Sequence, residues 1–123
     1  MSQVIGNEEL PNNGSVYTFE GYLDDDVDVS FFLSDMTPGK GPDLHKRPYD
    51  VVFVVQEGEL TFTVGDETIE AAGGQIVIAP AGEPHKFVNS GTKRARHIDI
   101  HTSQRMVTYW LEVQGQEDTS QGR

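Results

Sequence analysis

The stretch Gly74–Asn89, GQIVIAPAGEPHKFVN, holds a short apolar run, a turn rich in proline and glycine, and a second run that starts at a histidine. The apolar run predicts a buried strand that Pro80 ends, and Gly82 allows the chain to reverse sharply. His85 then opens the next strand, on the same face as Asn89, because side chains along a strand repeat every two residues. The stretch therefore predicts two antiparallel strands joined by a tight loop.

Similar signals lie on both sides of this stretch. Gly65-Asp66 stands between the alternating runs TFTV and ETIE, which is typical of a two-residue β-hairpin. Further strands are expected at 15–21, 28–36, 50–56, 59–64, 75–79, 85–89 and 95–101. Residues 106–113 fit a strand or a short helix equally well. Short strands at this spacing, with no convincing helix and no internal repeat, predict an all-β sandwich or barrel.

The length of 123 residues fits one domain. We expect a flexible N-terminal arm at 1–14, a single β-barrel domain at 15–113 and a disordered polar tail at 114–123. The chain has no cysteine, so disulfides, thiol catalysis and zinc ribbons are excluded.

Nine basic and 20 acidic residues give a net charge of −11. A phosphate backbone or an anionic membrane would repel such a surface, so neither nucleic acid nor membrane is an expected partner. The N-terminal residues lack the basic and apolar regions of a signal peptide, and no run is long enough to span a bilayer. A cytoplasmic location is the resulting expectation.

The first stretch resembles the second signature of the cupin family, G-x5-P-x-G-x2-H-x3-N. Each of its defined positions is matched, by Gly74, Pro80, Gly82, His85 and Asn89. This resemblance implies a cupin-type antiparallel jelly-roll β-barrel that acts on a small molecule.

The segment 39–58 resembles the first cupin signature, G-x5-H-x-H-x3/4-E-x6-G, in part. Gly39, His45 and Gly58 match it, but Arg47 stands at the second histidine position and Val51 at the glutamate position. The family's metal site uses two histidines and a glutamate from this signature and a histidine from the other. The resemblance therefore implies that only His45 and His85 remain as ligands of a degenerate metal site.

Two histidines rarely hold a divalent ion tightly, because catalytic metal sites usually have three protein ligands. Asp50 cannot simply replace the missing glutamate, since a shift of one residue along a strand turns its side chain to the other face. A third ligand would have to come from His97, Asp99 or His101, which share one strand face. One interpretation places that face in solvent and the intervening isoleucines in the core. The other places the face in the cavity, where Asp99 and His101 are the better candidates for the third ligand.

Arg47 suggests an alternative to a metal. A guanidinium repels a metal cation, and a buried one needs a partner such as Asp99 or an anionic ligand. Arg47 would bind a carboxylate or enolate, or stabilise developing negative charge. His45 and His85 would serve as general acid and base. A position of Arg47 in solvent at the barrel mouth is the competing interpretation.

These residues predict an enzyme of metal-independent acid/base chemistry, of the isomerase, cyclase or dehydratase type. Its ligand is a small organic molecule, a carboxylate or an enolisable compound, and no cofactor is expected. The predicted catalytic residues are His45, Arg47, His85, Asp99 and His101. One alternative is a metal-dependent oxygenase with Fe, Mn, Ni, Cu or Zn on His45 and His85, and another is a non-catalytic ligand-binding protein. Apolar residues in SFFL and YWLEV are compatible with a homodimer, although a monomer also fits.

Overall fold

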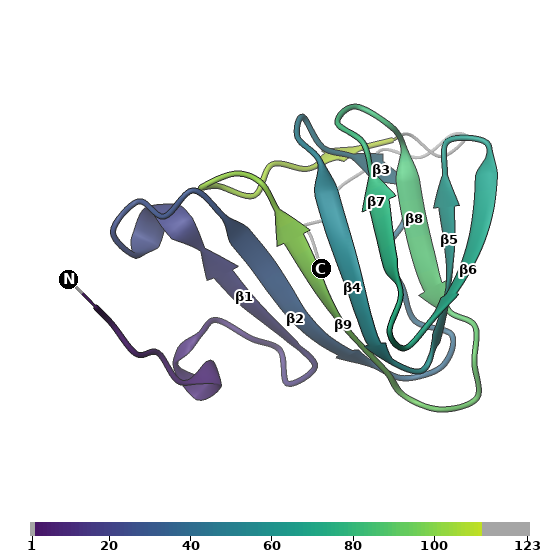
Figure 1. Ribbon diagram of the computed structural model, residues 1–123, viewed down its shortest axis with the longest axis horizontal. Coiled ribbons are helices and arrows are strands. Elements are labelled where there is room, and N and C mark those ends of the chain that lie inside the picture. Colours follow the sequence, from purple (N-terminus) through teal and green to yellow (C-terminus); the bar gives the residue numbers. More distant parts are fainter. Residues whose placement is uncertain (1, 112–123) are drawn as a thin grey trace.

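The computed structural model describes residues 2–111, which form two facing antiparallel sheets (Figure 1). One sheet has the strand order β1-β2-β9-β4-β7 and is called sheet A here; the other has the order β10-β3-β8-β5-β6 and is called sheet B. The strands are β1 (Val16–Glu20), β2 (Ser30–Met36), β3 (His45–Lys46), β4 (Val51–Glu57), β5 (Glu59–Val64), β6 (Glu67–Ala72), β7 (Ile76–Ala79), β8 (His85–Asn89), β9 (Ala95–His101) and β10 (Tyr109–Trp110). Two short 3₁₀ helices, η1 (Asn7–Glu9) and η2 (Gly21–Leu23), complete the described part, in which no helix is long and apolar enough to cross a membrane.

The strand predictions agree closely with the structure. The expected strands at 85–89 and 95–101 coincide with β8 and β9, and Gly65-Asp66 joins β5 to β6 as a two-residue hairpin with Val64 paired to Glu67. Gly65 adopts a φ of +57°, a conformation that favours glycine. Within 106–113, the structure forms a strand rather than a helix, because Tyr109 and Trp110 pair with β3; residues 112 and 113 lie outside the described residues.

The domain boundaries stay predictions. Part of the expected arm forms η1, and Asn12 makes a bridge to Tyr17 at the start of β1. The expected tail at 114–123 lies outside the described residues.

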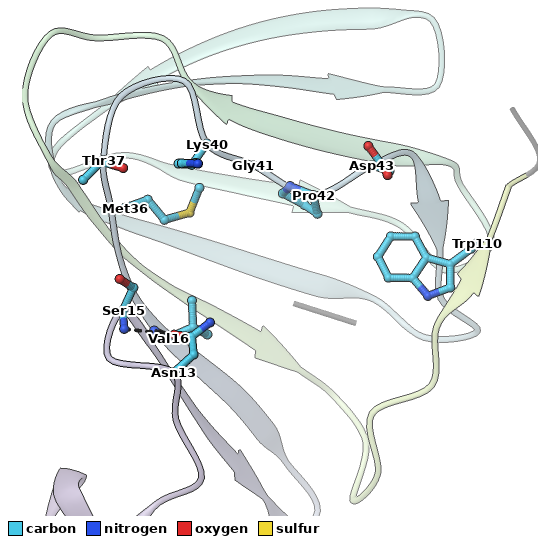
Figure 2. Close-up of a pocket in the computed structure, with 10 residues that line it drawn as sticks. All are labelled: Asn13, Ser15, Val16, Met36, Thr37, Lys40, Gly41, Pro42, Asp43 and Trp110. Atoms are coloured by element: carbon cyan, nitrogen blue, oxygen red, sulfur yellow. Dashed lines mark hydrogen bonds between the residues drawn. The ribbon is translucent and has the colours of Figure 1, made fainter. Parts of the chain in front are cut away.

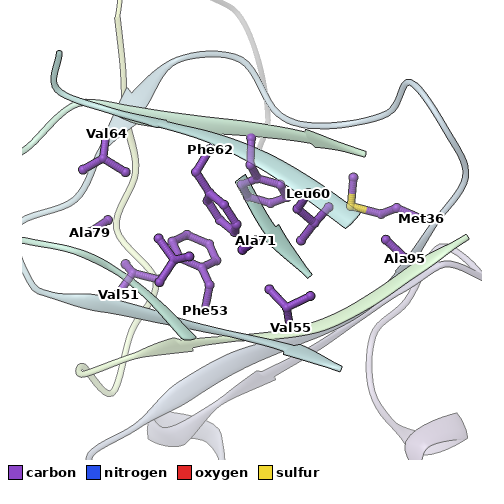
Figure 3. Packing of buried hydrophobic residues seen from close by; sticks show 12 residues of the cluster. Met36, Val51, Phe53, Val55, Leu60, Phe62, Val64, Ala71, Ala79 and Ala95 are labelled. Atoms are coloured by element: carbon purple, nitrogen blue, oxygen red, sulfur yellow. The ribbon is translucent and has the colours of Figure 1, made fainter. Parts of the chain in front are cut away.

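The hydrophobic core fills the space between the two sheets (Figure 3). It follows from alternation, since every second residue is buried in β5 and in β4 as far as Val55. Phe53 of β4 meets Phe62 and Phe87 of sheet B, with ring centroids 4.9 and 5.3 Å away. These aromatic contacts fasten one sheet to the other.

Strand β9 reverses the usual distribution of polar and apolar side chains. Its inward residues His97, Asp99 and His101 are buried, whereas Ile98 and Ile100 point to the outer face of sheet A and are only half-buried. The polar face of this strand therefore lines the interior of the barrel. The alternative, in which the isoleucines belong to the core, is wrong.

Asn89, the last fixed position of the second signature, closes the loop between β8 and β9. Its side-chain nitrogen donates to the carbonyl oxygens of Met36 at 2.9 Å and Lys93 at 2.8 Å, and its oxygen accepts the backbone N–H of Gly91 at 3.0 Å. The side chain is buried, so these backbone groups would lose their partner without gaining water. It thus serves as a structural clamp between β2 and β8.

We expect Asn89→Ala to lower the free energy of unfolding by about 2–3 kcal/mol, because it leaves buried polar groups unsatisfied. Urea denaturation measures the change. An exposed residue of the same loop supplies the control, since Thr92→Ala should change stability by less than about 0.5 kcal/mol. Equal stabilities of the two variants would contradict the clamp.

Candidate functional site

His45 and His85 lie side by side inside the barrel. They are the paired residues of β3 and β8, both are buried, and their ring centroids are 4.4 Å apart. Each is the first residue of its strand, where the preceding loop delivers the chain into sheet B. The two signatures therefore converge on one pair of imidazoles.

The two histidines share the same orientation. The Nδ1 atom of His45 bonds the carbonyl oxygen of Asp43 at 2.7 Å, and that of His85 bonds the carbonyl oxygen of Glu83 at 3.0 Å. A carbonyl oxygen only accepts hydrogen bonds, so in both rings Nδ1 carries the proton. Nε2 is then the atom of each ring at which a proton is taken up or released.

Aromatic rings surround this histidine pair. The ring centroid of Trp110 lies 5.1 Å from that of His45, and the ring of Phe53 meets His85 edge-on at 5.9 Å. Such surroundings exclude water and strengthen the electrostatic interactions that the imidazoles make.

Arg47 is 3% exposed, so it lies inside the barrel and not in solvent at its mouth. Its guanidinium donates to the hydroxyl of Thr108 at 2.7 Å and to the carbonyl oxygen of Val107 at 3.2 Å. Both partners come from the segment that leads into β10, about sixty residues away. These bonds fix the position of a buried cation just after β3, two residues from His45.

Asp99 is held by a histidine of its own strand. Its carboxylate lies 2.5 Å from Nδ1 of His97, and both side chains are fully buried. The pairing of Asp99 with Arg47 stays a prediction. Nε2 of His97 lies 3.1 Å from the sulfur of Met36.

His101 also points into the barrel. Its Nδ1 forms a hydrogen bond of 2.7 Å with the hydroxyl of Tyr49, which accepts the backbone N–H of Val107 at 3.0 Å. Tyr49, Thr108 and His97 are the polar residues that the predicted catalytic set leaves out. Tyr49 follows His45 and Arg47 at steps of two residues, so alternation along the sequence is a signal that could have found it. No local pattern in the sequence marks Thr108.

A pocket of about 440 Å³ opens beside these residues, between the start of β1, the end of β2 and β10 (Figure 2). Its walls include Met36 and Trp110, which contact His97 and His45 respectively. Lys40, Asp43, Asn13 and Ser15 add polar groups to the lining. Two wall residues of the pocket therefore contact buried histidines: Trp110 contacts His45, and Met36 contacts His97.

The donor atoms present do not fit the metal site that the family resemblance implies. Within residues 2–111 no group of three or more histidine and acidic side chains is placed to hold a metal ion. At the two lost ligand positions stand the buried cation of Arg47 and Val51, a core residue with no ligand atom. His45 and His85 alone leave the set one ligand short of the usual three.

We expect protein purified without chelator or metal-affinity resin to contain less than about 0.1 metal ion per chain, because two histidines bind divalent ions weakly. Elemental analysis measures this. The double variant Arg47→His/Val51→Glu restores the signature and should take up metal under the same conditions. A near-stoichiometric metal in the wild-type protein would contradict the expectation and favour the oxygenase alternative.

Two facing antiparallel sheets with a polar group of side chains between them define a jelly-roll barrel that encloses its site. Residues 32–101, more than half of the chain, match the family model described as a cupin domain. The chain belongs to the cupin family. The family prediction and the fold prediction are confirmed.

Solved structures support the same fold. An uncharacterized conserved protein with a double-stranded beta-helix domain from Klebsiella pneumoniae is 21% identical, with a TM-score of 0.70 over 92% of this chain and 100% of its own. Oxalate oxidase is 17% identical with a TM-score of 0.72; the match covers 88% of this chain and 63% of the oxidase, so the chain spans less than two thirds of that protein. Oxalate decarboxylase of Bacillus subtilis, a protein with Mn(II) centres, is 18% identical with a TM-score of 0.72 over 78% of this chain and 27% of its own. No curated protein matches the chain.

Proposed function

We propose that this cupin is an enzyme that moves a proton on a small enolisable carboxylate without a metal ion. His45 and His85 are the acid/base pair, and Arg47 is the cation that receives negative charge. The observation that carries the proposal is the buried histidine pair, in which Nδ1 of each ring is bound to a backbone carbonyl oxygen. Because Nδ1 carries the proton in the neutral form, Nε2 is the basic nitrogen of each ring, and the proposal assigns proton transfer to it.

The reaction is an exchange of protons at a carbon next to a carbonyl group. Nε2 of a neutral histidine takes the proton from this carbon, and the electron pair of the C–H bond forms an enolate. Nε2–H of the other histidine, in its protonated form, then returns a proton to the same or a neighbouring carbon. The sum is an isomerisation or an exchange with solvent, and elimination of a β-hydroxyl as water would extend it to a dehydration.

A buried cation supports an anionic ligand. Arg47 is anchored by Thr108 and Val107, so its charge needs no reorganisation when an enolate forms. Lys40 and Asp43 both line the pocket, so these two residues add no net charge to it. Oxalate oxidase and oxalate decarboxylase, which share this fold, are named for a dicarboxylate, which supports a carboxylate as the ligand but not its enolisation, since oxalate has no C–H bond.

The pocket beside the histidine pair has room for a small ligand; none of His45, His85 and Arg47 lines it, but its wall residue Trp110 contacts His45. Its volume of about 440 Å³ lies within the range of small-molecule sites, about 300–1,000 Å³. Asp99 and His101 support the site from the opposite sheet, since each forms a hydrogen bond with a neighbouring side chain.

The cytoplasmic location stays a prediction.

The test is incubation of the protein in D₂O with a panel of 2-oxo acids, 3-oxo acids and simple carboxylates, followed by NMR of the carbon-bound protons. Deuterium incorporation in at least one enolisable acid above the buffer rate is the expected result. Calorimetric binding of a carboxylate without exchange would favour the ligand-binding alternative. Neither binding nor exchange across the panel would overturn the proposal.

A further inference from the structure

The segment that leads into β10 runs antiparallel to the segment that begins with β3, at the edge of sheet B. Its contacts with the site follow one another at a step of two residues. Trp110 pairs with His45, and two residues earlier the hydroxyl of Thr108 accepts a hydrogen bond from Arg47. Tyr109 lies between them in the chain and is 51% exposed. Alternation along the strand therefore turns Thr108 and Trp110 to the site and Tyr109 to solvent.

Trp110 belongs both to the pocket and to the surroundings of the histidine pair. Its side chain lines the pocket, and Figure 2 shows the indole directed from β10 toward the other residues of the wall. The centroid of its ring lies 5.1 Å from that of His45, which is only 2% exposed beside an open pocket. Asp43 also lines the pocket and contacts His45, but through its backbone oxygen on Nδ1, the nitrogen that does not react. The indole is thus a side chain that separates the pocket from the ring of His45.

Strand β10 is weakly held. It has two residues, it lies at the edge of its sheet, and its partner β3 also has two residues. Beyond this pairing, the backbone N–H of Leu111 donates to the carbonyl oxygen of Leu44 at 3.3 Å. By contrast, β5 pairs with β8 at five positions. Few backbone hydrogen bonds and half-buried side chains are typical of segments that open locally, so the indole lies on a part of the sheet that moves at low cost.

We propose that Trp110 is the specificity-determining residue of the site, an inference that rests on the proposed acid/base function. Its indole closes the pocket from the histidine pair and limits the reaction to acids with a small substituent. The carboxylate of the ligand binds the buried Arg47, and the reacting carbon lies at Nε2 of His45 or His85. A larger substituent on that carbon extends toward the pocket and meets the indole. One methylene in an apolar pocket changes kcat/KM by about 10–200-fold, so a ring in this place discriminates strongly by size.

Chemical modification of the histidines tests the closure without any substrate. Diethyl pyrocarbonate acylates neutral imidazoles, and mass spectrometry of the peptides gives a rate for each histidine. All four histidines of the chain are buried, so all should react slowly in the wild-type protein. Trp110→Ala should raise the rate at His45 at least about tenfold, because the pocket then reaches this ring. His97 and His101 should stay protected, since Trp110 does not cover them.

Two further variants separate the indole from the strand that carries it. Trp110→Phe keeps an aromatic ring in place and should retain most of the protection of His45. Tyr109→Ala removes the neighbouring side chain on the outward face of β10 and should leave all four rates unchanged.

Three outcomes of the modification would overturn the proposal. An unchanged rate at His45 in Trp110→Ala would mean that the indole does not close the site. Equal acceleration of all four histidines would mean that Trp110 supports the fold as a whole. The same acceleration in Tyr109→Ala would assign the effect to loosening of β10 and not to loss of the indole.

The size limit is measured by deuterium exchange into two 2-oxo acids, pyruvate and phenylpyruvate, each corrected for the buffer rate. Their reacting carbons differ by a phenyl substituent. The ratio of kcat/KM for phenylpyruvate to that for pyruvate should rise at least about tenfold in Trp110→Ala and stay unchanged in Tyr109→Ala. An unchanged ratio in Trp110→Ala would overturn the size limit. Absence of exchange with every acid would overturn the proposed function and the size limit together, whereas the modification rates still decide whether Trp110 closes the pocket from the histidines.

Discussion

Asp99→Ala should lower the free energy of unfolding by about 3 kcal/mol, because it removes the charged partner of a buried hydrogen bond. Its carboxylate is the partner of Nδ1 of His97, and both side chains are shut off from water. Alanine would leave that nitrogen buried without this acceptor. It would also open a void between Phe32 and Phe53, the neighbours of Asp99 on β2 and β4. Urea denaturation followed by the fluorescence of Trp110, the single tryptophan, measures the loss.

Asp99→Asn is the matched control. Its side-chain oxygen still accepts a hydrogen bond from Nδ1 of His97, so the loss should be about 1–2 kcal/mol, the usual cost of weakening one bond of this kind. A loss below about 1 kcal/mol for Asp99→Ala would mean that the pair contributes little. The deuterium-exchange rate of Asp99→Asn separates the two roles of the residue: an unchanged rate assigns it to support of the barrel, and a large loss to the chemistry.

Much of the fold could be predicted because its decisive signals are local. Glycine and proline mark the loop around Gly82, and alternation marks β5 and β9 over six and seven residues. Strand β3 was missed because it has two residues, too few for any period. Strand β10 was left undecided because its conformation depends on pairing with β3, a tertiary contact.

The candidate site was predictable only where a motif positions it. The two signatures lead to His45 and His85, which the structure brings together. The pattern of β9 separates its residues into two faces but does not say which face is inward, and here the apolar face of Ile98 and Ile100 is the outer one. Thr108 and Trp110 reach the site from the far end of the described chain, so nothing near Arg47 or His45 in sequence announces them.

His85→Ala should reduce the rate of deuterium exchange into the responsive carboxylate by at least about 100-fold, the lower end of what a positioned acid or base contributes. The reason is the loss of Nε2, the basic nitrogen of the tautomer that the bond from Nδ1 to the carbonyl oxygen of Glu83 selects. NMR of the carbon-bound protons in D₂O measures the rate. Lys86→Ala is the control, since Lys86 is exposed on the opposite face of β8 and the exchange rate should stay unchanged.

His45→Ala should show a loss of similar size, because the exchange needs one ring to take the proton and the other to return one. Residues that act as a unit are not additive, so the double variant should be little slower than either single variant. Calorimetry should find carboxylate binding reduced less than about threefold in both, since the charge that attracts the ligand resides on Arg47 and not on the histidines. Full exchange in either single variant would refute the pair as the acid and base, whereas a multiplied loss in the double variant would mean that the two rings act independently.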